Sequence, residues 1–71
     1  MKQVVYINPP CCCDICKQPI DSMFFDSYLP EIGTWANVCP ECFEEYGGRL
    51  GTGMGQKYVR LDDGKFIKTA G

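Results

Sequence analysis

Two pairs of cysteines constrain this chain more than any other feature. Each pair has two residues between its members, and the pairs are Cys13/Cys16 and Cys39/Cys42. A CxxC turn directs both thiolates to the same side, so two such turns can complete a sulfur tetrahedron around one metal ion. The 22 residues between the pairs form a spacer slightly longer than the usual about 15–20. We therefore predict one structural zinc ion bound by these four cysteines, with iron as the alternative metal.

The size of the chain explains why it needs such a site. Ordering 71 residues costs about 1.5 kcal/mol per residue in conformational entropy, and apolar burial in so small a body usually only balances that cost.

Histidine is absent, which removes the usual side chain for acid–base chemistry near neutral pH. A shell of four cysteines leaves no open position on the metal for water or substrate. We therefore expect no enzymatic activity.

Two further cysteines directly precede the first pair. Cys11 and Cys12 are adjacent to Cys13, so either is an alternative ligand to it. The repeated CxxC spacing favours Cys13. In the simplest interpretation, Cys11 and Cys12 pack at the end of a strand and have no role.

Local patterns predict a small α+β fold in one domain. Turn residues separate segments rich in β-branched and aromatic residues, and Pro40 and Gly47 delimit a short helix. The expected elements are a strand at 3–7, a tight turn at 13–20, strands at 23–29 and 34–38, a helix within 39–48, a glycine-rich loop at 49–55 and a hairpin at 57–69. The domain 1–71 divides into an N-terminal strand with a cysteine-rich lead-in (1–12), a zinc finger (13–48), and a loop with a hairpin (49–71).

The order of turn, hairpin and helix in residues 13–48 resembles the treble-clef and zinc-ribbon group of zinc fingers. In a treble clef, a zinc knuckle supplies the first cysteine pair and the first turn of a helix supplies the second. The resemblance implies the metal site and leaves the function open, because the group includes nucleic-acid binders, ubiquitin ligases and adaptors. The whole chain also looks like small, uncharacterised zinc-finger proteins of phage and prophage genomes.

The C-terminal hairpin carries the predicted interaction surface. A two-residue turn at Asp63-Gly64 would place Leu61 opposite Phe66 and direct both inward, together with Val59. The other face would then expose three side chains, namely Tyr58, Arg60 and Ile67. Tyr and Arg are over-represented in interface hot spots, and the loop 50–56 would adapt around a partner. The alternative is that this face packs on the N-terminal strand and completes the fold.

Net charge and composition help to choose among three candidate functions. The formal charge is −2, and four thiolates with one divalent ion change it to about −4. This charge disfavours nucleic acid, although residues 49–71 hold five basic and two acidic side chains. We therefore predict a protein-interaction or adaptor module, with a nucleic-acid-binding zinc finger as the alternative. A second alternative is a dithiol redox protein that uses Cys39 and Cys42, whose C-P-x-C motif resembles that of glutaredoxin-like oxidoreductases.

The remaining expectations concern compartment and core. The apolar run after Met1-Lys2 ends at Pro9 and is too short for a signal peptide. Paired cysteines in a reducing compartment are more often metal ligands or redox centres than disulfides, so we expect a cytoplasmic protein without membrane contact. The aromatic side chains of the central segment are expected to pack in the core or against the metal site; they are Phe24, Phe25, Tyr28 and Trp35.

Overall fold

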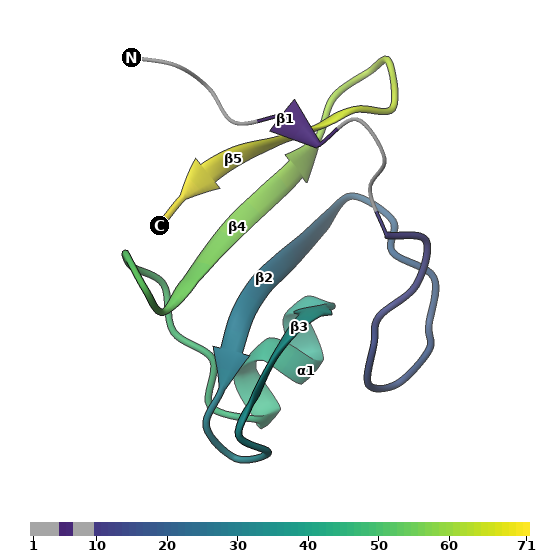
Figure 1. The fold of residues 1–71 in the computed structure, drawn as a ribbon. Coiled ribbons are helices and arrows are strands. Elements are labelled where there is room, and N and C mark those ends of the chain that lie inside the picture. The colour runs from purple at the N-terminus through teal and green to yellow at the C-terminus, as the bar shows by residue number, and fades with distance from the viewer. Residues whose placement is uncertain (1–4, 7–9) are drawn as a thin grey trace.

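The computed structural model describes the backbone of residues 5–6 and the whole of residues 10–71. Its elements are β1 (Val5–Tyr6), β2 (Met23–Leu29), β3 (Thr34–Val38), α1 (Pro40–Glu45), β4 (Gly55–Arg60) and β5 (Phe66–Ala70). The strands form one antiparallel five-stranded sheet in the order β1-β5-β4-β2-β3 (Figure 1). The small α+β class is therefore confirmed. The other residues of the predicted strand 3–7 lie outside the described part of the chain.

The central hairpin forms where the sequence predicts it. β2 and β3 pair from Phe25 with Val38 to Leu29 with Thr34. Between them, the amides of Ile32 and Gly33 both donate to the carbonyl of Leu29, at 3.1 and 2.7 Å. Gly33 has a φ of 70°, a conformation that glycine adopts without steric cost.

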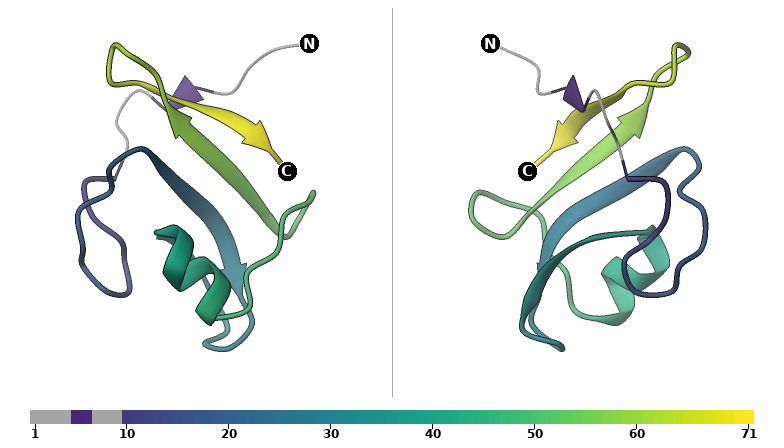
Figure 2. Two further views of the ribbon diagram at one scale, coloured as in Figure 1. Left: turned by 180° about the vertical axis from the view of Figure 1, so that it is seen from behind. Right: turned by 45° about the vertical axis from the view of Figure 1, so that its right-hand side comes forward.

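Helix α1 is bounded by capping residues at both ends. Cys39 is the N-cap, and Pro40 occupies the first turn, where its missing N–H costs nothing. At the other end Gly47 has a φ of 80°, and its amide donates to the Glu44 carbonyl while that of Gly48 donates to Phe43. This pair of hydrogen bonds is a Schellman motif. The predicted short helix is confirmed, and it lies across one face of β2 and β3 (Figure 2).

Two hydrophobic clusters lie on opposite faces of β2, because successive residues of a strand point to opposite sides of its sheet. The cysteine-face cluster, on the side of α1, consists of Cys13, Phe25, Leu29, Ala36, Val38 and Cys42. The aromatic cluster, on the other side, consists of Phe24, Tyr58 and Phe66. The ring of Phe25 stacks on that of Phe43 with 3.9 Å between centroids. The ring of Phe24 stacks on Tyr58 at 5.1 Å and meets Phe66 edge-on at 5.2 Å.

The turn of the C-terminal hairpin differs from the predicted one by one residue. The amide of Leu61 donates to Lys65, and that of Gly64 donates to Leu61, so three residues form the loop. Gly64 has a φ of 89°, as in a three-residue hairpin loop with a glycine bulge. As a result Phe66 pairs with Arg60 instead of Leu61. A one-residue change of register reverses the faces of a strand, and Leu61 is exposed.

The glycine-rich segment makes a tight turn against β2. The amides of Gly51 and Gly55 each donate to the other's carbonyl, at 2.9 and 3.0 Å. A Cβ at Gly55 would lie 2.8 Å from the Ser27 Oγ, so only glycine permits this close approach. Of the helices in the described residues, none is long and apolar enough to cross a membrane.

Candidate metal centre

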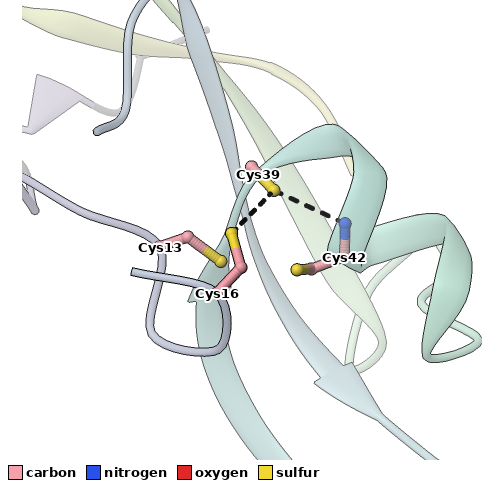
Figure 3. A group of neighbouring side chains, drawn as sticks. All are labelled: Cys13, Cys16, Cys39 and Cys42. Atoms are coloured by element: carbon pink, nitrogen blue, oxygen red, sulfur yellow. Dashed lines mark hydrogen bonds between the residues drawn. The ribbon is translucent and has the colours of Figure 1, made fainter. Parts of the chain in front are cut away.

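Four cysteine side chains meet beside the N-terminus of α1 (Figure 3). Their Sγ atoms all lie within 4.8 Å of one another, and the four residues are Cys13, Cys16, Cys39 and Cys42. We call this group the cysteine cluster. These are the four ligands that the doubled CxxC spacing predicts. The structure therefore holds a group of side chains able to bind one metal ion, although the first and second pairs come from separate parts of the chain.

The first pair is presented by a turn at residues 13–18. The amide of Cys13 donates to the Gln18 carbonyl at 2.9 Å, and that of Lys17 donates to the Cys13 carbonyl at 3.1 Å. Lys17 adopts a φ of 65°, which is uncommon for a residue with a Cβ and lets the chain reverse after Cys16. The Ile15 amide lies 3.4 Å from the Cys13 Sγ, so the turn directs an N–H group at its own thiol.

Asp14 fixes this turn to the edge strand β3. Its amide donates to the Asn37 carbonyl at 2.9 Å, and its Oδ2 accepts from the Asn37 amide at 2.9 Å. Because Asn37 lies two residues before Cys39, these hydrogen bonds set the distance between the two cysteine pairs. In the sequence, nothing marks Asp14 for this positioning role except its place inside the first CxxC.

The second pair is presented by the first turn of α1. The Cys39 side chain caps the helix by accepting from the Cys42 amide at 3.5 Å. Cys42 then points back from the first turn and is buried, with 4% of its surface exposed. The first turn of α1 therefore presents both sulfur atoms of this pair toward the first pair.

The thiols differ in acidity. Burial acts to raise the pKa of Cys13, but backbone N–H groups of Cys16 and Cys39 outweigh it and lower the pKa to about 6. Burial, together with hydrogen bonding to the Cys13 and Cys39 side chains, raises the pKa of Cys42 above its usual range. Without a cation the cluster therefore resists holding several thiolates together. A divalent cation would remove that repulsion and displace the protons.

The sulfur positions fit a tetrahedral ion. A tetrahedron with metal–sulfur bonds of about 2.3 Å has sulfur–sulfur edges of about 3.8 Å. The Cys16 and Cys39 Sγ atoms, which join the two turns, are 3.8 Å apart. All six cysteines of the chain are free of disulfides. Four thiolates at this spacing suit zinc or iron.

Cys11 and Cys12 do not belong to the cluster. Cys12 forms an isolated bridge with Pro19, and the Cys11 carbonyl accepts from the Ile20 amide at 3.0 Å. Cys11 is exposed and Cys12 is half-buried. Both residues therefore serve through their backbone to close the loop that carries the first pair.

The predicted interaction surface is wrong in one of its three residues. Tyr58 belongs to the aromatic cluster and is 5% exposed, because the one-residue difference in the hairpin brings Phe66 to its face. Burial raises the pKa of Tyr58, and the nearby Asp26 charge adds to this effect. Arg60 is exposed and Ile67 is half-buried. Any binding through these two residues stays a prediction. The N-terminal strand β1 pairs edge to edge with β5.

Two aromatic residues that were expected in the core are at the surface. Tyr28 is 39% exposed and Trp35 is 47% exposed. They are cross-strand partners on β2 and β3, and their rings meet edge to face at 6.2 Å. The alternation of β2 shows the reason, because Phe25 and Leu29 face α1 while Tyr28 faces away from it.

Comparisons with known proteins leave this centre as the best guide to function. No protein-family model matches the chain, and neither the curated proteins nor the solved structures give a significant match. The described residues show a small α+β fold and a four-cysteine group suited to a metal ion.

Proposed function

We propose that this chain is a non-catalytic module, built on one structural zinc ion, that binds another protein. The observation that carries the proposal is the meeting of four Sγ atoms within 4.8 Å from two CxxC turns. The order of cysteine turn, hairpin β2–β3 and helix α1 supports a treble-clef-like arrangement. In that arrangement the ion links the 13–18 turn to the first turn of α1.

A structural role follows from the donor set. Four thiolates fill the coordination shell of a tetrahedral ion, so no position is left for water or a substrate. Two of the donors, Cys13 and Cys42, are buried in the cysteine-face cluster with Phe25 and Val38. The ion would therefore lie at the margin of the hydrophobic core, where its binding free energy contributes directly to folding.

A dithiol redox role for Cys39 and Cys42 is less well supported. The Cys39 Sγ has a neighbour from the other pair, Cys16, at 3.8 Å, so the second pair does not stand alone.

Metal content and ligand variants test the zinc site. Elemental analysis of the purified chain should give one zinc per chain, and Ser variants of Cys13, Cys16, Cys39 or Cys42 should each lose most of it. Cys11→Ser and Cys12→Ser are matched controls, since these residues adjoin the site without entering it, and they should keep full zinc content. Full zinc content in the first set, or loss in the controls, would contradict the assignment.

Salt-dependent binding separates the protein-interaction role from the nucleic-acid alternative. Phosphate contacts dominate affinity for nucleic acid and weaken steeply with salt. Because the chain is acidic, with a formal charge of −2, we expect no retention on immobilised DNA or RNA at physiological salt. Retention that salt removes would support the nucleic-acid-binding alternative.

A further inference from the structure

A small apolar pocket lies beyond the end of β2, on the side of the molecule away from the C-terminal hairpin turn. Its volume is ≈ 120 Å³, and it is lined by Tyr28, Pro30, Gly47, Arg49, Gly53 and Met54. A dry apolar cavity of about 150 Å³ holds a benzene molecule. At ≈ 120 Å³ the pocket therefore has room for an aliphatic side chain.

The pocket is built on fixed backbone although its apolar side chains are exposed. The Met54 carbonyl accepts from the Tyr28 amide at 2.9 Å and from the Ser27 Oγ at 3.2 Å. The Met54 side chain nevertheless stays 45% exposed. Gly47 on the opposite wall is held by the Schellman motif of α1. The backbone of both walls is therefore in place before any partner arrives, which lowers the entropy cost of binding.

One cation lies at the pocket, and it has no ion-pair partner among the described residues. Among the described residues, the ion pairs join Arg60 to Asp21 and Lys65 to Asp63. The Arg49 side chain is exposed, and its planar guanidinium is suited to a carboxylate. An aliphatic side chain in the pocket would bring the neighbouring residues of its own chain close to this guanidinium.

The residue types around the pocket are those of an interaction site. Trp35 continues the exposed surface from Tyr28, and Tyr, Trp, Met and Arg are all enriched at interfaces between proteins. A single arginine on a chain of negative net charge is a poor counterpart for a run of phosphates. The chemistry therefore favours a peptide over a nucleic acid.

From these observations we propose that Tyr28, Met54 and Arg49 form a docking site for an acidic peptide segment. The segment inserts an aliphatic side chain between Tyr28 and Met54 and places an adjacent carboxylate against Arg49. This site rests on the proposed function and names the chemistry of its partner. It also replaces the surface predicted around Tyr58.

Selection from a random peptide library displayed on phage tests the site, with the zinc-loaded full chain as bait. We expect the enriched peptides to share an aliphatic residue beside Asp or Glu. Synthetic copies of these peptides should bind Arg49→Glu about tenfold more weakly than the unchanged chain in fluorescence polarisation. Met54→Ala should weaken binding severalfold, since it removes one wall while the backbone bonds of Met54 remain.

Lys65→Glu is the matched control. It makes the same change of charge in the hairpin turn at the other end of β4, and it should leave peptide binding unchanged. Zinc content and amide dispersion in NMR spectra are checked for every variant, so that unfolding is not mistaken for lost binding.

Three outcomes would overturn the site. If Arg49→Glu and Lys65→Glu bind the peptides equally well, the site is wrong while the interaction role stands. If no peptide is enriched by zinc-loaded bait, both proposals fail. If a short oligothymidylate binds and Arg49→Glu weakens it, the surface belongs to nucleic acid instead.

Discussion

The two faces of β2 are held together by different means. On one face, the cysteine-face cluster packs Phe25, Leu29 and Val38 beside thiols that approach one another within 4.8 Å. On the other face three aromatic rings pack together, and Phe24 contacts both Tyr58 and Phe66. Aromatic side chains bury large areas and pack favourably at these separations. Free thiols give no such return, so the proposed metal ion would add its binding free energy to the first face alone.

This difference shows how a small domain can divide its stabilisation between two sources. Phe24 and Phe25 are adjacent residues of β2, and each packs in one of the two hydrophobic clusters. Strand β2 is therefore shared by both faces. Whether the faces also unfold together is an experimental question.

Removal of zinc should have the largest effect. Structural zinc in finger peptides contributes about 10–16 kcal/mol of apparent free energy at pH 7, which exceeds the net stability of a typical small domain. A strong chelator should therefore collapse the amide dispersion of the whole NMR spectrum, including β4 and β5, because both faces share β2. Dispersed signals confined to β4 and β5 after verified metal removal would show that the aromatic face folds by itself.

Acidification should release the metal by a related route. The pKa of Cys13 in the folded chain is about 6, below its ordinary value of 9.0. Such a group stabilises the fold fully above its unfolded pKa and loses that contribution as the pH falls through the folded pKa. We expect zinc to be retained at neutral pH and released on acidification, as protons compete for the four thiolates, measured with a colorimetric zinc indicator. Zinc content that stays unchanged well below about pH 4, where carboxylates also protonate, would contradict thiolate ligation.

Two neighbouring substitutions compare the faces directly. Phe24→Ala and Phe25→Ala make the same chemical change at buried positions, and each should cost about 3–5 kcal/mol in unfolding free energy. Phe25→Ala should also speed the transfer of zinc to a competing chelator, since it loosens the cysteine face. Phe24→Ala should instead speed amide exchange in β4 and β5. Equal rates of zinc transfer in both variants would contradict local loosening of the cysteine face and would show that zinc leaves only when the whole fold opens.

The smallest effect is expected from Asp14. Asp14→Ala removes the hydrogen bond from the Asn37 amide to its Oδ2, which should cost about 1 kcal/mol, or a fall in melting temperature of about 4–8 °C. Asp21→Ala is the control, because its ion pair with Arg60 is 3.9 Å long and exposed and such pairs contribute little. Equal melting temperatures for the two variants would contradict a positioning role for Asp14.

The sequence predicted the elements that local chemistry decides. CxxC spacing identified the residues of the cysteine cluster, and Pro40 with Gly47 identified the helix. The strands at 23–29 and 34–38 have the predicted bounds, because turn residues flank each of these runs of aromatic and β-branched residues. Each of these features is decided by a few residues that are neighbours in the sequence.

Features that depend on distant pairing were predicted less well. The Asp-Asp-Gly turn is compatible with a two- or three-residue loop, and this one-residue difference decided whether Tyr58 or Leu61 is buried. The pairing of β4 with β2 leaves no local signal, so the pocket at Met54 was not predicted. Exposure of Tyr28 and Trp35 follows from which face α1 covers, and strand composition alone does not contain that information.

The strand order also has a consequence for how the protein is made. Val5 pairs with Ile67, so β1 has no partner until β5 has left the ribosome. Residues 13–48, which hold the whole cysteine cluster, are synthesised before β4 and β5. The four cysteines are therefore complete before the sheet can close, and metal capture at the cluster would not have to wait for β1 to pair with β5.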